Sequence, residues 1–246
     1  MHALTNSVLT AVWWGGAAAA SLIIGYFLAG RGLSNRAIGM VMGIGAGALL
    51  SAIAYELIPE SNLHGMGTAV MFFLGAIAFF AADWVIDRRG GADRKDIAGD
   101  QAGGSGSAIF IGTLLDNVPE SLILGMSVAL GGAINFAFLA AVFVSNLPEG
   151  VAGTINLVAA GRSRRSIFWM WMVLVLISAA FSGLGYLMIH WLPGVDGRYA
   201  QAFAAGAMLT MLADAMMPEA FEHGGYLVGL FTVMGFLAAA VLSSLQ

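Results

Sequence analysis

Cysteine is absent from this chain of 246 residues, and charged residues make up only 10% of it. Without cysteine, neither a disulfide framework nor a thiolate metal site is possible. The single lysine, Lys95, lies in a polar stretch, so the buried Schiff base of a light-driven protein is excluded as well. The few basic residues form no basic footprint of the kind that binds nucleic acid.

Hydrophobic residues, in contrast, make up 59% of the chain, and the mean hydropathy is +0.87. This balance is far from that of a soluble globular protein. The apolar residues gather in eight blocks of about 20, the length that an α-helix needs to cross the hydrocarbon core of a bilayer. The blocks are 8–29, 37–58, 67–87, 108–130, 133–159, 166–190, 199–217 and 225–244. We therefore predict an all-α membrane protein with eight transmembrane helices in a single domain, 1–246.

The basic residues between the blocks predict the orientation, because cytoplasmic loops collect Lys and Arg. Those in the first, third and fifth loops are Arg31, Arg36, Arg88, Arg89, Arg94, Lys95, Arg162, Arg164 and Arg165. Only Arg198 falls on the other side. We expect both termini outside the inner (cytoplasmic) membrane, and residues 88–107, rich in Gly and Ser, to form a flexible cytoplasmic loop.

Two sequence repeats stand out. Residues 46–60, AGALLSAIAYELIPE, align without a gap on residues 205–219, AGAMLTMLADAMMPE, with seven of fifteen positions identical. A shorter pair is DNVPE (116–120) and SNLPE (145–149). In the predicted topology the copies run in opposite directions, so we expect helices 1–3 and 6–8 to be inverted repeats around central helices 4 and 5. Such repeats are typical of secondary transporters.

Three carboxylates lie within the central blocks: Asp116 and Glu120 in the fourth, and Glu149 in the fifth. A charged side chain near the bilayer centre costs at least about 2.5 kcal/mol and usually marks an ion or proton path. No Lys or Arg lies within the central helices. The compensating cation is therefore a proton, a partner chain or a bound metal ion.

Prolines and amides accompany these carboxylates. Pro119 and Pro148 cannot donate backbone hydrogen bonds, so each is expected to free a carbonyl oxygen and to bend its helix beside the acidic residues. The amides of Asn117 and Asn146 can add oxygen ligands to a cation cage. The alternative left open is that the carboxylates are protonated and bonded between helices.

These motifs resemble those of the ZIP family of divalent metal transporters, and the likeness extends over all eight predicted helices. The resemblance rests on DNVPE in the fourth helix, SNLPE in the fifth and residues 203–225 in the seventh. It implies alternating access around a metal centre. The metal ligands that it implies are Asp116, Asn117, Glu120, Ser145, Asn146 and Glu149.

The chain also departs from the family pattern. Asp116 and Ser145 stand where the family often has histidine, and the sixth helix offers only Ser182 where a second metal site often has an acidic residue. A binuclear centre is therefore not expected. Oxygen ligands alone favour ions such as Mn(II) or Fe(II), although Zn(II) also accepts carboxylates.

Further polar residues lie near the ends of the second and seventh helices, where they would form the entrances of a transport path and concentrate cations. They are Glu56, Glu60, Asp214, Glu219, Glu222 and His223. Alternatively, the polar residues at the helix ends face water and have no role in transport. His2, His64 and His190 are expected to be interfacial side chains.

The sequence thus predicts transport of a divalent metal ion (Zn, Fe, Mn or Cd) into the cytoplasm, with the ion as substrate and no organic cofactor. Membrane lipid is the expected partner, with a homodimer left open. An enzyme is not expected, because the only nucleophile-like pattern, GGSG (103–106), lies in the polar loop. The serious alternative is a ZIP-like protein that senses metal, carries another cation or has a structural role.

Overall fold

The computed structural model describes residues 2–61, 63, 65–91, 106–131, 135–191 and 197–245. Within these ranges every regular element is a helix, and seven helices are long and apolar enough to cross a membrane. The first six coincide with the first six predicted blocks, and the seventh, Gly197–Ser244, covers both remaining blocks. The chain is therefore an all-α protein of the multi-pass membrane class.

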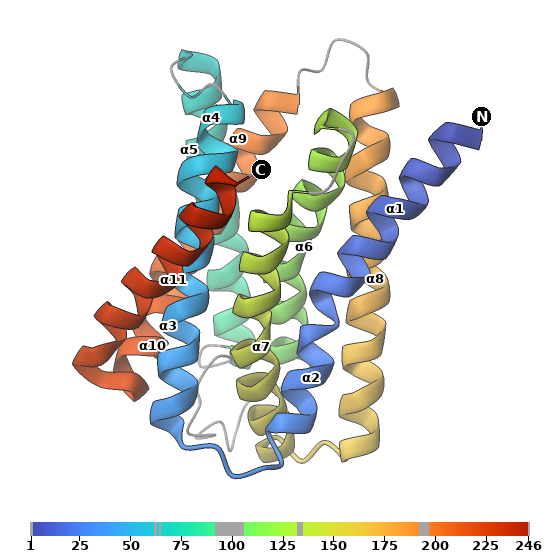
Figure 1. Cartoon of the computed structure of the whole chain (residues 1–246). Coiled ribbons are helices and arrows are strands. Elements are labelled where there is room, and N and C mark those ends of the chain that lie inside the picture. Colours follow the sequence, from blue (N-terminus) through green and yellow to red (C-terminus); the bar gives the residue numbers. More distant parts are fainter. Residues whose placement is uncertain are drawn as a thin grey trace.

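The elements follow one another along the chain as shown in Figure 1. Their bounds are α1 (His2–Ala19), α2 (Ser21–Leu28), α3 (Asn35–Ala52), η1 (Ile53–Leu57), α4 (Ile58–Ser61), α5 (Met66–Ile86), η2 (Asp87–Gly91), α6 (Gly106–Gly131), α7 (Phe136–Ala159), α8 (Arg164–Trp191), α9 (Gly197–Met211), η3 (Leu212–Met216), α10 (Met217–Gly224), η4 (Gly225–Leu227) and α11 (Val228–Ser244). Of the predicted flexible loop 88–107, residues 92–105 lie outside the described residues.

Local signals explain where several helices begin and turn. The Ser34 hydroxyl accepts a hydrogen bond from the Ala37 amide at the start of α3, and Asn135 caps α7 in the same way through Phe138. Such side chains satisfy amides that a helix start leaves without partners. Gly225 has a φ of 69°, which suits glycine, and there the chain turns from α10 toward α11.

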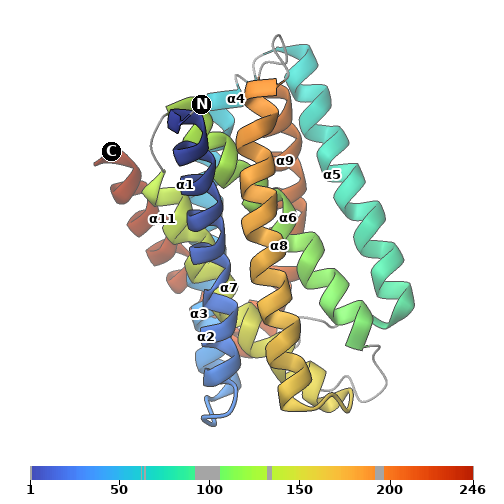
Figure 2. The same ribbon diagram turned by 90° about the vertical axis from the view of Figure 1, so that its right-hand side faces the viewer.

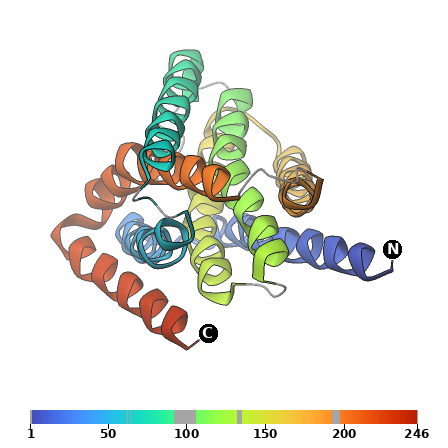
Figure 3. The ribbon, with the colours of Figure 1, turned by 90° about the horizontal axis from the view of Figure 1, so that it is seen from above.

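Two central helices, α6 and α7, are surrounded by the others (Figures 1 and 3). In each of them 67% of the most apolar stretch is buried, against 17% in α5, which lies on one side of the bundle (Figure 2). All three helices are apolar. The exposed face of α5 therefore suits lipid, whereas α6 and α7 form the interior. The two polar motifs thus lie on helices of the interior.

Glycines bring four parallel helix pairs into backbone contact. In each pair, a Cβ atom on a glycine of either helix would overlap a backbone carbonyl of the other helix. The glycine pairs are Gly47 with Gly235 (α3 and α11), Gly206 with Gly75 (α9 and α5), Gly25 with Gly150 (α2 and α7), and Gly185 with Gly125 (α8 and α6). Small residues let membrane helices pack this closely. We call these four contacts the glycine crossings.

The repeated stretches 46–60 and 205–219 adopt the same local structure. Each contains a π-helical segment, η1 and η3, and the two segments occupy identical positions when the stretches are aligned. Gly47 and Gly206, which form glycine crossings, also occupy aligned positions. A π-helical turn is rare and is often found at functional sites.

Candidate cation site

The six residues predicted to bind metal are all buried between the central helices. Their exposed fractions are 1% for Asp116 and Asn117, 2% for Glu120 and Ser145, 0% for Asn146 and 6% for Glu149. Both helices continue through their prolines, Pro119 and Pro148. The helix positions predicted from sequence therefore place these polar groups inside the bundle and away from lipid.

Asn146 links α7 to α6. Its side-chain Nδ2 donates to Asn117 Oδ1 at 3.3 Å and to Glu120 Oε2 at 3.4 Å. The amide of Asn117 is itself held, because it donates to the Thr113 carbonyl at 2.9 Å. One amide group of α7 thus contacts both an amide and a carboxylate of α6.

The other end of the Asn146 amide is a buried oxygen. Asn146 Oδ1 accepts no hydrogen bond from any residue that the structure describes. Leaving such an acceptor buried without a donor costs about 1 to 3 kcal/mol. A cation or a water molecule beside this oxygen would offset that cost.

The serines near this point differ in their surroundings. The Ser145 hydroxyl donates to the Val142 carbonyl at 2.9 Å, and its backbone is packed against Gly45 of α3. Ser182, the residue of the sixth predicted helix considered for a second metal site, donates to the Ala11 carbonyl at 2.8 Å. Ser182 therefore engages α1, and it adds no charge to the centre.

No three His, Asp or Glu side chains converge on a point where they would hold one ion, as far as the described ranges go. The oxygen cage of Asp116, Glu120 and Glu149 thus stays a prediction. What the structure adds is the amide bridge from Asn146 to Glu120. Spacing places the three carboxylates on facing helices, but it does not determine their side-chain rotamers.

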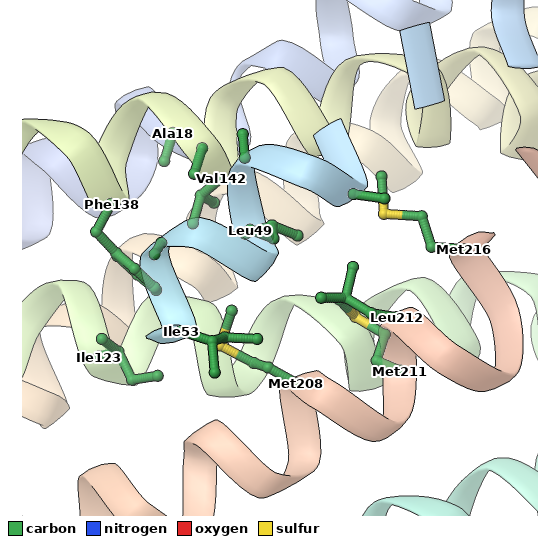
Figure 4. Close-up of a cluster of buried hydrophobic side chains, with 14 of the residues drawn as sticks. Ala18, Leu49, Ile53, Ile123, Phe138, Val142, Met208, Met211, Leu212 and Met216 are labelled. Carbon is green, nitrogen blue, oxygen red and sulfur yellow. The ribbon is translucent and has the colours of Figure 1, made fainter. Parts of the chain in front are cut away.

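Apolar side chains enclose this polar centre. One buried cluster is contributed by η1, α6, α7, α9 and η3, and it includes Ile53, Ile123, Phe138, Met208 and Leu212 (Figure 4). A second cluster contains Trp171, whose indole nitrogen donates to Thr154 of α7 at 2.9 Å. In such surroundings the carboxylates interact with an ion or a donor more strongly than they would in water.

Glu56 and Glu60 are bonded to amides of distant helices. Glu56 Oε2 accepts from the Asn135 amide, and Glu60 Oε2 accepts from the Gln201 amide. Sequence reasoning missed both amides. The only signals were the position of Asn135 just before a predicted helix and the long polar side chain of Gln201 in an apolar block.

The remaining residues of the predicted path lie elsewhere. Glu219 Oε1 and His223 Nδ1 lie 2.8 Å apart on α10, while Asp214 and Glu222 are exposed. Figure 1 shows α10 and α4 toward opposite ends of α3, so the predicted path residues form two separate groups. Asn156 and Asp83, which the sequence reasoning did not select, are buried in α7 and α5.

Comparisons were made with models of known protein families and with curated proteins. Neither comparison gave a match to this chain.

Proposed function

We propose that this chain carries a divalent metal ion across the membrane, with α6 and α7 holding the ion. The observation that carries the proposal is the Asn146 amide, which bonds Glu120 through its nitrogen while its buried oxygen lacks a donor among the described residues. A carboxylate and an amide oxygen are ligands that divalent cations accept. The resemblance of the two motifs to those of ZIP transporters points the same way.

The substrate class follows from the ligands. Asp116, Asn117, Glu120, Asn146 and Glu149 offer only oxygen toward a cation, which favours Mn(II) and Fe(II) and admits Zn(II) and Cd(II). Because the binding carboxylates must be deprotonated, we expect uptake to fall as the pH is lowered. A titration of uptake against pH, with the pH equal on both sides of the vesicle, checks this.

The wider architecture supports a transporter. We propose eight crossings, with the last two predicted blocks as separate spans, and inverted repeats that include α3 and α9. The support is the aligned π-helical segments, the aligned Gly47 and Gly206, and the start of α1 and end of α11 at the same end of the bundle (Figures 1 and 2). Inverted repeats provide two alternative packings around one central site.

The test is uptake of Zn(II), Cd(II), Mn(II), Fe(II) and Mg(II) into liposomes that contain the purified chain. Glu120→Gln keeps the size of the side chain and an acceptor for Asn146 but removes the charge, and Glu149→Gln does the same on α7. Asp87→Asn removes a carboxylate of η2, outside the predicted site and path, and is the matched control. We expect the double variant Glu120→Gln, Glu149→Gln to lose at least about tenfold in uptake, as the loss of metal-site groups typically does.

Equal uptake by the double variant and the parent would sink the proposal, provided that both elute as folded protein. Absence of uptake in both would favour the alternative that a ZIP-like chain senses metal or is structural. Asp116→His tests whether Asp116 is a metal ligand. Because imidazole suits zinc, the order of metal ions by uptake is expected to shift toward Zn(II). An unchanged ranking would remove Asp116 from the ligand set.

A further inference from the structure

Two hydrogen bonds join the segment η1 and α4 to distant parts of the chain at the end predicted to be outer. Glu56 and Asn135 are 79 residues apart in sequence, and Glu60 and Gln201 are 141 residues apart. In both, a side-chain amide donates to a carboxylate. Bonds that involve an ionised group are roughly twice as strong as neutral ones. They therefore hold three separate helical segments together at this end.

Asn135 has two roles at once. Its oxygen accepts from the Phe138 amide at 2.9 Å and caps α7, while its nitrogen donates to Glu56. The helix whose interior carries Asn146 is thus fastened, at its first turn, to the π-helical segment η1.

Gln201 is a buried residue of α9. It is 1% exposed, and α4 packs against α9, the helix that carries it (Figure 1). Glu56 and Glu60 lie close enough to repel each other electrostatically. The two amides therefore hold two like charges near one another, and a divalent cation at this point would compete with both amides.

Apolar side chains lie just inside these bonds. Phe138 is in the first turn of α7, which Asn135 caps, and Ile53 begins η1, which carries Glu56. Both belong to the buried cluster seen in Figure 4. Separation of α7 from η1 would divide this cluster between the two elements and open a way toward Asn146.

We propose that the bonds of Glu56 to Asn135 and of Glu60 to Gln201 form an outer latch, which a divalent cation opens by binding the two carboxylates and releasing the two amides. The role of the cation rests on the transport function proposed above. The latch itself does not, because its closure excludes water from Asn146 whether or not an ion is transported.

The absence of native cysteine allows a direct test. Ser145→Cys places one thiol at the centre, and Val142→Cys places one a turn nearer the latch. The rate of labelling by a membrane-impermeant maleimide, added on the side of α4, reports how often the latch opens. Agreement between the two thiol positions would show that a change in labelling does not come from a local effect of one cysteine.

The latch variants are chosen to leave the helix cap intact. Asn135→Asp keeps an oxygen that caps α7 but removes the donor to Glu56, since Asp caps as well as Asn. Gln201→Glu removes the other donor. We expect each to raise the labelling rate by about tenfold, the factor that one charge-assisted bond represents. The exchanged pairs Glu56→Gln with Asn135→Asp, and Glu60→Gln with Gln201→Glu, are expected to restore slow labelling.

Two outcomes would overturn the latch: unchanged labelling in Asn135→Asp and Gln201→Glu at both thiol positions, or fast labelling that the exchanged pairs do not reverse. Added Mn(II) or Zn(II) is expected to speed labelling of the parent and to leave Glu56→Gln, Glu60→Gln unaffected. Labelling of the parent that does not respond to either metal overturns the role of the cation. A latch that opens in a chain without metal uptake would refute the transport proposal alone.

Discussion

The stretches 46–60 and 205–219 share a backbone, yet their glutamates make different bonds. Both contain a π-helical segment at the same position, and both end in Pro-Glu. Glu60, at the end of the first, bonds to Gln201 on another helix, whereas Glu219, at the end of the second, pairs with His223 four residues later. Repeated sequence thus reproduces the backbone, whereas the bond that each carboxylate makes depends on the side chains that lie beside it.

The largest effect is expected at the glycine crossings, where the two stretches are most alike. Gly47→Ala and Gly206→Ala would each force a Cβ atom into a carbonyl of the partner helix, α11 or α5. Overpacking of this kind costs about 3 kcal/mol. Thermal unfolding in detergent is expected to show similar losses for both variants.

A matched control lies on α11. Gly235 forms a crossing, while a Cβ atom at Gly229 would meet only one atom, 4.0 Å away. Gly229→Ala is therefore expected to leave the unfolding temperature unchanged or to raise it, and Gly235→Ala to lower it. Equal behaviour of these two variants would mean that close approach is not what these glycines provide.

Deletion of one residue in each π-helical segment tests whether the two stretches differ in their effect on the outer latch. Removal of Ala54 would turn the following residues by about 100° around the helix axis and carry Glu56 and Glu60 away from their amides. Removal of Ala213 would move Glu219 and His223 together. We expect the first deletion to raise labelling at Val142→Cys by about tenfold, and the second to leave it unchanged. Equal labelling of both deletions would show that the two stretches contribute alike to closure.

The smallest effect is expected from single glutamates. Glu60→Ala removes a bond between helices and is expected to cost about 1 kcal/mol of unfolding free energy. Glu219→Ala removes the contact with His223 four residues later, worth about 0.5 kcal/mol. Chemical denaturation in mixed micelles would rank them. A larger loss of unfolding free energy in Glu219→Ala than in Glu60→Ala would contradict the difference between the two stretches.

The parts of the structure that were predictable are those that local sequence determines. Long apolar blocks located the helices, because a bilayer imposes their length, and the spacing of Asp116 and Glu120 placed both on a buried helix. Partners separated by many residues were not predictable. Nothing in the sequence of Glu60 and Glu219 distinguishes their bonds, since the difference comes from Gln201, which reaches α4 only through the packing of α9.

In the candidate cation site, too, burial was predictable from local sequence, whereas hydrogen-bond partners were not. Burial of Asn146 was predicted from its helix, whereas its choice of Asn117 and Glu120 as partners depends on the side-chain rotamers of two facing helices. The π-helical segments were not predicted either. Their residues, IAYEL and LADAM, have no feature that separates them from an ordinary helix.

The glycine crossings also restrict how the molecule can move. A contact of backbone on backbone contains no side chain that can change rotamer, so each pair of crossed helices behaves as one stiff body. The hydrogen bonds of Asn146, Glu56 and Glu60 all run from one such body to another. We therefore expect relative motion of these bodies to be concentrated at these hydrogen bonds. If the proposed transport function holds, these are the contacts at which a bound ion would act.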